Sequence, residues 1–232
     1  ARVVEAALRA SSWGLLSRVG ERRWGMGVPG ESAGGVDAPS PGLDLGGIAK
    51  GYTADACRDL AVAMGACGVL VSVGTSSVSV FGTRADGSSW RAGLRDPQGG
   101  PTSVAGIVEL PAGGMASLST SGDNLGPLGV LAPEVVGRAA GSVSDRRARE
   151  TSPGGGRVFD HHIIDPRTGY PAHAGVRQVS VVASSGVLAE ALSTALLVDP
   201  SIDVPDVVAR WACETGAPAS AKVVGLVRAE QS

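Results

Sequence analysis

The sequence is poor in aromatic side chains, cysteine and lysine, and each shortage narrows the range of functions. Of 232 residues, aromatics make up 3%, and the cysteines number three. Their spacing lacks the CxxC pairs and clustered histidines of a zinc site, so we expect buried free thiols at Cys57, Cys67 and Cys213. Only two lysines, Lys50 and Lys222, stand among the 20 basic residues. A lysine inside a glycine-rich loop is therefore a candidate binding residue.

Long hydrophobic runs and an excess of charge of one sign are also missing. The formal net charge is −2, and no dense run of Lys and Arg gives the basic surface of a nucleic-acid or membrane-surface binder. No apolar run reaches the roughly 18 residues of a membrane span, and no signal segment is present. With 43% hydrophobic and 18% charged residues, we expect one folded domain over residues 1–232, with a short N-terminal part.

Glycine and short apolar segments dominate what is present. The 35 glycines predict many tight turns around a core of Val, Leu and Ala. The patterns predict helices over 1–19, 52–64, 187–198 and 204–214, a loop over 20–42, and strands over 69–73, 78–81, 90–94, 104–110, 115–120, 161–165, 177–183 and 222–228. Residues 124–157 lack a sustained period, and we expect a mobile insertion there. Consecutive strands with segregated helices predict an α+β fold whose mixed, largely antiparallel sheet is flanked by helices.

A glycine-rich loop with a lysine precedes the helix predicted over 52–64. Residues 42–55 read GLDLGGIAKGYTAD. Paired glycines let the backbone approach a ligand, a helix N-terminus offers free N–H groups, and Lys50 adds a positive charge, so the segment suits a phosphate. It matches neither the Walker A motif nor the dinucleotide fingerprint. The alternative is an ordinary strand-to-helix turn with a solvated lysine, in which Asp44 and Asp55 act as caps.

A second candidate site is the histidine-containing turn at residues 161–171, which reads HHIIDPRTGYP. His161 and His162 alternate across a short strand, so only one of them faces any given site. An imidazole that titrates near neutral pH can accept a proton from a nucleophile. Asp165 and Thr168 can equally serve only to hold the turn.

A third candidate is the apolar helix predicted over 187–198, which contains the sequence AEALSTA. Glu190 and Thr194 are four positions apart and share one helix face, so they can offer a carboxylate and a hydroxyl to one hard cation such as Mg²⁺. The alternative is an edge of the helix where Ser193 and Thr194 bond back to carbonyls.

The sequence resembles the ApbE family of flavin transferases in four segments that follow one another in the same order. They are the glycine-lysine loop, an STSG segment at 119–122, HIIDPRTG and AEALSTA. The resemblance covers about residues 42–228. Members of that family bind FAD and Mg²⁺, cleave the pyrophosphate, and attach FMN to a Thr or Ser hydroxyl of a target protein with release of AMP. The resemblance therefore implies FAD as substrate, Mg²⁺ as cofactor and an acceptor protein as partner.

The resemblance also implies roles for individual residues. The cation is held by a backbone carbonyl of the glycine loop, best matched by Gly47, and by Glu190 and Thr194. His162 matches the base that takes the proton of the acceptor hydroxyl. The residues implied for FAD binding and for the shape of that site are Gly46, Lys50, Ile164, Asp165 and Thr168.

Two departures from the family keep alternatives open. Glu190 stands where the family usually has Asp, and no flavin-contacting region is evident before residue 42. An FAD pyrophosphatase that yields FMN and AMP and a non-catalytic flavin-binding protein are therefore the alternatives to FMN transfer. The resemblance implies a location on the exported side of a bacterial membrane, while the lack of a signal segment leaves a cytoplasmic location open.

Overall fold

The computed structural model describes residues 4–5, 8, 13–27, 42–99, 102–122 and 162–228. His161 and the insertion expected at 124–157 lie outside these ranges. The helices are α2 (Ala49–Ala63), α3 (Gly186–Val198) and α4 (Val204–Thr215), with a short 3-10 helix at Trp13–Leu15. No helix in the described part of the chain is long and apolar enough to cross a membrane.

The main sheet has five strands in the spatial order β11-β10-β7-β4-β3. They are β3 (Gly68–Val73), β4 (Ser77–Gly82), β7 (Met115–Gly122), β10 (Val176–Ala183) and β11 (Ala221–Arg228). Three two-stranded ribbons accompany it: β1 (Leu16–Gly20) with β2 (Arg23–Met26), β5 (Arg91–Arg95) with β6 (Val104–Glu109), and β8 (Ile164–Asp165) with β9 (Tyr170–Pro171). Every pairing between described strands is antiparallel, and the α+β class is confirmed.

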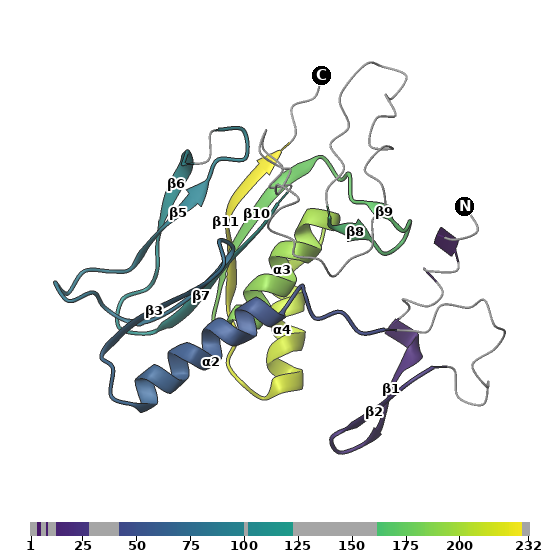
Figure 1. Ribbon diagram of the computed structural model, residues 1–232, viewed down its shortest axis with the longest axis horizontal. Coiled ribbons are helices and arrows are strands. Elements are labelled where there is room, and N and C mark those ends of the chain that lie inside the picture. The colour runs from purple at the N-terminus through teal and green to yellow at the C-terminus, as the bar shows by residue number, and fades with distance from the viewer. Residues whose placement is uncertain are drawn as a thin grey trace, which may run out of the picture.

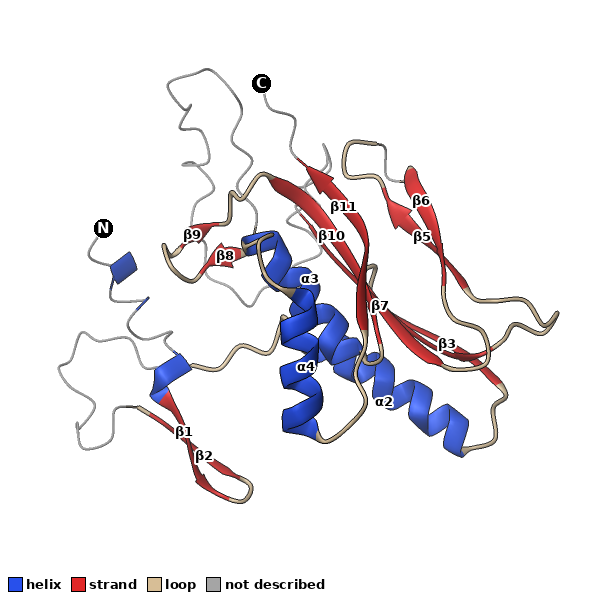
Figure 2. Cartoon of the chain, turned by 180° about the vertical axis from the view of Figure 1, so that it is seen from behind, coloured by secondary structure: helices blue, strands red, loops and turns tan. Residues whose placement is uncertain are grey.

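The main sheet lies between helices and a hairpin. α2 and α3 pack on one face, and the β5–β6 ribbon lies on the other side (Figures 1 and 2). Side chains alternate along each strand, so Ser77 and Ser79 of β4 face the helices, where they contact carboxylates. Val78, between them, and Val80, after them, point to the other face and pack with Leu94 of β5. The centre of the helix-facing side is therefore polar.

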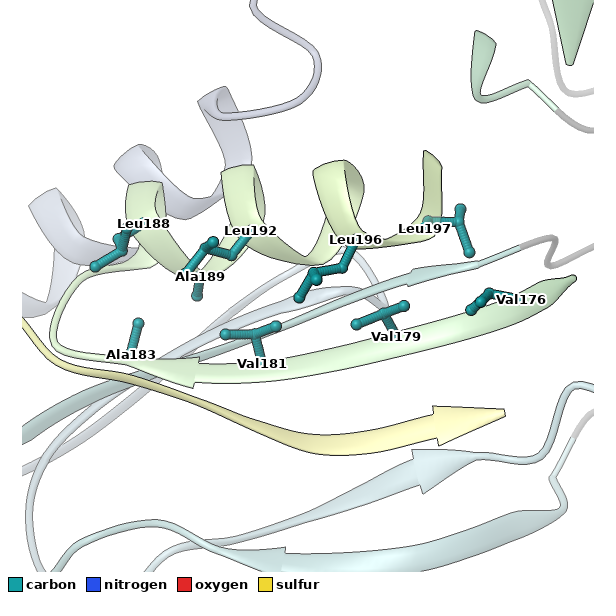
Figure 3. Packing of buried hydrophobic residues seen from close by; sticks show 9 residues of the cluster. All are labelled: Val176, Val179, Val181, Ala183, Leu188, Ala189, Leu192, Leu196 and Leu197. Carbon is teal, nitrogen blue, oxygen red and sulfur yellow. The ribbon is translucent and has the colours of Figure 1, made fainter. Parts of the chain in front are cut away.

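The apolar core on the helix side is built by α3 and β10 (Figure 3). Leu188, Leu192 and Leu196 recur every four positions and lie against Val179 and Val181 of β10. The start of α3 is fixed by the hydroxyl of its N-cap, Ser185, which accepts a hydrogen bond from the N–H of Leu188 at 3.2 Å. This packing anchors α3, the helix that carries Glu190 and Thr194.

The central helices and strands agree with the sequence prediction within a few residues. The helix expected over 1–19 is confirmed at Val4, Glu5 and Leu8. The rest of that expectation and the loop expected over 20–42 are wrong in part, because two short apolar stretches joined by a tight turn pair locally as the β1–β2 hairpin. The strand expected over 161–165 is confirmed at Ile164–Asp165, while His161 lies outside the described residues. The three cysteines are free but exposed rather than buried, since they lie on outward-facing positions of helices and in a turn.

Candidate active site

The glycine-rich loop turns into α2 through its own backbone. Asp44 Oδ1 accepts a hydrogen bond from the N–H of Gly46 at 2.7 Å, and the N–H groups of Ile48 and Ala49 donate to the carbonyl of Leu45. The N-cap residue, Ile48, makes no side-chain hydrogen bond to the first turn of α2. The remaining N–H groups of that turn therefore need a partner from outside the helix.

That partner is α3, and the two helices cap each other where they cross. The N–H of Gly51 donates to Glu190 Oε2 at 2.6 Å, and the N–H of Gly186 donates to Asp55 Oδ2 at 2.6 Å. A Cβ added to Gly51 would lie 2.2 Å from the carbonyl oxygen of Gly186. Glycine at both positions is therefore what allows each carboxylate to reach the other helix.

Asp55 also anchors α2 to the sheet. Its Oδ1 accepts hydrogen bonds from Ser79 at 2.6 Å and Ser117 at 2.7 Å, and it pairs with Arg58 Nη1 at 3.0 Å. Arg58 is 3% exposed, and a guanidinium this buried requires a charged partner. The alternative in which Asp55 acts as a helix cap is thus confirmed, but Asp55 caps the start of α3 rather than its own helix, α2.

Glu190 is buried at 2% exposure, and its carboxylate contacts the start of α2. Oε1 forms an ion pair with Lys50 Nζ, and Ser77 Oγ lies 3.5 Å from the same oxygen. Lys50 Nζ also donates to the carbonyl of Gly46 at 3.2 Å. A buried carboxylate is stable only with a compensating charge. Lys50 supplies that charge and so stabilises the buried, ionised form of Glu190.

Thr194 lies one helical turn after Glu190 and borders a cavity beside the glycine loop. Its hydroxyl is 3.0 Å from Ser121 Oγ, which is also 2.8 Å from the hydroxyl of Ser193. The interpretation of Ser193 as a back-bonding residue is confirmed, since its hydroxyl donates to the carbonyl of Glu190 at 3.1 Å. Thr194 is therefore held in place by Ser121 of β7.

The implied magnesium ligands suit that ion in chemical type. Gly47 and Thr194 line one cavity, and Glu190 is buried on α3 one turn before Thr194. A carbonyl, a carboxylate and a hydroxyl are oxygen ligands of the kind that Mg²⁺ takes. The Lys50 ammonium between a loop carbonyl and Glu190 shows that this position accepts positive charge. No three His, Cys, Asp or Glu side chains cluster for a metal in the described ranges, so most ligands would come from water and substrate.

The cavity beside the glycine loop has a volume of about 1010 Å³ and a mostly apolar wall. Three motifs far apart in the sequence meet on it, because Gly47, Ile164 and Thr194 all line it. Two tryptophans line it as well: Trp13, in the 3-10 helix before the N-terminal hairpin, and Trp24, in the hairpin itself. They are 77% and 59% exposed. The cavity thus joins a glycine loop, a hydroxyl-bearing helix and two exposed aromatic side chains.

The two tryptophans are the functional candidates that the sequence prediction missed. We expected a loop around Trp24 and found no ligand-contacting region before residue 42. In the structure, the 3-10 helix places Trp13 on the cavity wall, and the hairpin that follows places Leu16 and Trp24 there. A weak signal was present in the sequence: Leu16 and Trp24 flank a short polar stretch, at Glu21 and its neighbours, that can form a tight turn.

The turn after β8 is held by Arg167. Its backbone N–H donates to Asp165 Oδ1 at 2.8 Å and its Nη2 to Asp165 Oδ2 at 2.9 Å, and these hydrogen bonds hold the pKa of Asp165 below its ordinary value. Nη1 of Arg167 reaches Asp199 Oδ2, just after α3, at 3.0 Å. Gly169, at φ +74°, closes the turn in a conformation that side chains rarely adopt. The clamp ties this turn to the end of α3.

A second hollow of about 380 Å³ adjoins the first, and Arg167 lines both. Asp165, Thr168 and His173 line the second hollow. His162 is exposed in the stretch directly before β8 and belongs to neither wall. The implied site residues thus fall into separate groups. The main cavity is lined by Gly47, Ile164 and Thr194, and the second hollow by Asp165 and Thr168. Gly46, Lys50 and Glu190 contact one another, and His162 lines neither hollow.

Known proteins share sequence and fold with this chain. The chain is similar to the FAD:protein FMN transferase of Treponema pallidum, with 32% identity over 163 residues that make up 67% of this chain and 37% of the relative. It is similar to the enzyme of the same name from Salmonella typhimurium, with 30% identity over 174 residues, 75% of this chain and 41% of the relative. The crystal structure of the ApbE protein of Thermotoga maritima matches with a TM-score of 0.62 at 27% identity, over 99% of this chain and 61% of that one.

The chain spans less than half the length of these two curated relatives. The sequence model of the ApbE family nevertheless matches most of it, over residues 15–126 and 128–215. The match includes Trp24 of the hairpin as well as the three motifs that meet on the main cavity. The chain therefore belongs to the ApbE family.

Proposed function

We propose that this chain transfers FMN from FAD to a Thr or Ser hydroxyl of an acceptor protein, with Mg²⁺ as cofactor and AMP as the second product. The observation that carries the proposal is the meeting of Gly47, Ile164 and Thr194 on one apolar cavity of about 1010 Å³. Small-molecule sites commonly measure about 300 to 1,000 Å³, so the cavity suits a dinucleotide. The names of the curated relatives support the same reaction.

The cavity walls bind the two ends of FAD by different means. The exposed rings of Trp13 and Trp24 offer flat apolar surface to the isoalloxazine. At Gly47 nothing lies within 4 Å of an added Cβ, so the backbone there can approach the pyrophosphate. Because Thr168 lines the hollow next to the cavity, we assign it to the rim at which the acceptor approaches.

In the reaction, the acceptor oxygen forms a bond to the FMN phosphorus while the bond from that phosphorus to the bridging oxygen breaks, and AMP leaves. His162 accepts the proton of the hydroxyl, a role that typically contributes about 10² to 10⁴ in rate. Gly47, Glu190 and Thr194 would hold Mg²⁺, which would neutralise charge on the pyrophosphate. His162 is exposed, so a protein acceptor can reach it.

Hydrolysis of FAD to FMN and AMP is the second candidate, and the exposure of His162 is the observation that favours it. A histidine open to solvent can activate water as readily as a protein hydroxyl. The two reactions share the cleavage of the pyrophosphate and differ only in the group that receives FMN.

The test is to incubate the chain with FAD, with and without Mg²⁺, and to quantify AMP and FMN by chromatography. A panel of Thr- and Ser-containing peptides on a carrier protein serves as acceptor, read by flavin fluorescence in denaturing gels. We expect metal-dependent AMP release with covalent flavin on the carrier. Free FMN equal to AMP would assign hydrolysis, and FAD binding without AMP would refute both reactions.

Matched variants locate the chemistry. Glu190→Gln is expected to abolish metal-dependent AMP release, whereas Glu214→Gln on the exposed side of α4 is expected to leave it unchanged. His162→Ala is expected to slow transfer about 10²-fold or more. If His173→Ala slows the reaction instead and His162→Ala does not, the assignment of the base to His162 is wrong.

A further inference from the structure

We propose that Lys50 is an exchangeable counter-ion: its ammonium occupies the cation position beside Glu190, leaves it when a divalent cation binds, and then binds the pyrophosphate of FAD. The inference deepens the proposed function, on which it rests. It assigns Lys50 a place in the order of binding rather than a fixed contact with FAD.

The first observation is where the ammonium lies. Lys50 Nζ donates to the carbonyl of Gly46 at 3.2 Å and forms an ion pair with Glu190 Oε1. A glycine-loop carbonyl and the Glu190 carboxylate are also the kinds of oxygen assigned to the magnesium ion. The ammonium therefore occupies an oxygen of Glu190 that the divalent cation would need, and it lies against the loop carbonyl next to the assigned carbonyl of Gly47.

The second observation is that only one partner of the pair is free to move. The side chain of Lys50 is 40% exposed and that of Glu190 is 3% exposed. Glu190 Oε2 is fixed by the N–H of Gly51 at 2.6 Å, whereas Lys50 ends in a long flexible stem. A change at this pair moves the lysine and leaves the carboxylate in place.

The third observation is the balance of charge. Lys50 and Glu190 together are neutral, so while they are paired the site does not attract a divalent cation. A cation placed beside the ammonium would be repelled by it at short range. The ammonium must therefore leave for the carboxylate to bind a metal, and the binding is an exchange of one cation for another.

The displaced ammonium has a use in the cavity. Among the described residues that line the cavity, the charged ones are Asp44, Asp199 and Arg167. Arg167 is already paired with two carboxylates, of Asp165 and Asp199. The doubly charged pyrophosphate of FAD thus lacks an uncommitted positive side chain on this wall. Lys50, one residue into α2 beside the loop, can supply that charge once it leaves Glu190.

The exchange predicts that metal and FAD bind cooperatively. A metal frees Lys50 for the pyrophosphate, and FAD binds Lys50 away from Glu190, so each raises the affinity of the other by the same factor. Couplings between sites typically correspond to about 5- to 150-fold. Without the amine at position 50, most of this factor should vanish.

The test uses lysine labelling of the unmodified chain, because Lys50 and Lys222 are the only lysines in it. An amine-reactive ester is added with and without saturating Mn²⁺, and labelling at the two positions is compared by peptide mass spectrometry. Lys222 is exposed on β11 and serves as internal reference. We expect Mn²⁺ to increase labelling of Lys50 relative to Lys222 at least about fivefold, and FAD added with Mn²⁺ to lower it again. An unchanged ratio at saturating Mn²⁺ overturns the inference.

A second measurement titrates Mn²⁺ by the electron paramagnetic resonance signal of the free ion. Lys50→Met is expected to bind Mn²⁺ at least about fivefold more tightly than the wild type, while Lys50→Arg and the matched control Lys222→Met do not gain affinity. FAD should tighten Mn²⁺ binding in the wild type but not in Lys50→Met. Equal or weaker Mn²⁺ binding by Lys50→Met, or no Mn²⁺ binding by either protein, contradicts the inference.

The two proposals can fail separately. Displacement of Lys50 by Mn²⁺ with no AMP from FAD would refute the proposed reaction and leave the exchange standing. AMP release with Lys50 labelling that does not respond to Mn²⁺ would refute the exchange and leave the reaction standing.

Discussion

The backbone of Gly51 lies directly against the backbone of Gly186 at the crossing of α2 and α3. Four positions after each glycine stands a carboxylate, Asp55 in α2 and Glu190 in α3, and each accepts the N–H of the glycine on the other helix. The arrangement is a local twofold relationship between two helices that share no sequence repeat. It fixes the start of both helices, and with them the glycine loop and the Thr194 side of the cavity.

The glycine contact should not tolerate a methyl group. In Gly51→Ala the new Cβ would lie 2.2 Å from the carbonyl oxygen of Gly186, and because that atom is backbone, the helices must separate. We expect the free energy of unfolding, measured by urea denaturation, to fall by about 3 kcal/mol. Gly106→Ala, where nothing lies within 4 Å of the added Cβ, is the control. Equal stability of the two variants would disprove the close contact.

The two carboxylates that bind Arg58 should differ in their effect on stability. Asp55 contacts Arg58 Nη1 at 3.0 Å and Asp59 contacts its Nε at 2.8 Å, but their side chains are 14% and 55% exposed. Asp55→Asn leaves a buried guanidinium short of charge and should destabilise the chain by about 3 kcal/mol or more. Asp59→Asn should cost less than about 1 kcal/mol. Thermal and urea denaturation measure the difference, and a larger loss in Asp59→Asn would contradict the burial of this network.

The hairpin should contribute directly to flavin binding. Trp24 lines the cavity, so Trp24→Ala removes stacking surface and should raise the Kd for FAD roughly tenfold, as measured by flavin fluorescence. Val19 lies on the same hairpin, is 61% exposed and is not on the cavity wall. Val19→Ala should leave the Kd unchanged. If both variants bind FAD like the wild type, the tryptophan does not contact the flavin.

The Arg167 clamp should be visible in an acid titration. The Arg167 side chain lowers the pKa of Asp165, so the stability contributed by this carboxylate is present above its ordinary pKa and is lost as the pH falls through its lowered native pKa. In Arg167→Gln, carboxyl carbon NMR should show the pKa of Asp165 moving up. Asp86, whose pKa is lowered by hydrogen bonds from Ser88, should not change. A pKa of Asp165 that stays low without Arg167 would show that another group stabilises the carboxylate.

The sequence predicted most of the fold because its regular elements carry strong local patterns. Repeating apolar positions in α3, such as Leu188, Leu192 and Leu196, marked the helix, and they do pack on one strand. The Lys50–Glu190 pair was not predictable, since 140 positions separate the two residues and only the packing of α2 on α3 brings them together. The position of Trp24 was missed because a short hairpin has little alternation to distinguish it from a loop.

The site residues were predicted best where a motif fixes the local backbone. Gly47, Ile164 and Thr194 were each chosen from a separate motif, and all three line the main cavity. From the sequence, Glu190 was expected to offer its carboxylate to a metal. In the structure, one oxygen of that carboxylate is already paired with the Lys50 ammonium. The roles of all these residues stay predictions, and His162 in addition lies outside both walls.

The serine side chains under α2 have a consequence for the geometry of that helix. Ser79 and Ser117 are cross-strand partners, and both donate to Asp55. Apolar packing is non-directional and tolerates rotation of a helix about its own axis, whereas hydrogen bonds of 2.6 and 2.7 Å from two strands do not. The sheet therefore sets the rotational position of α2, and so determines the direction in which the first-turn side chain of Lys50 projects.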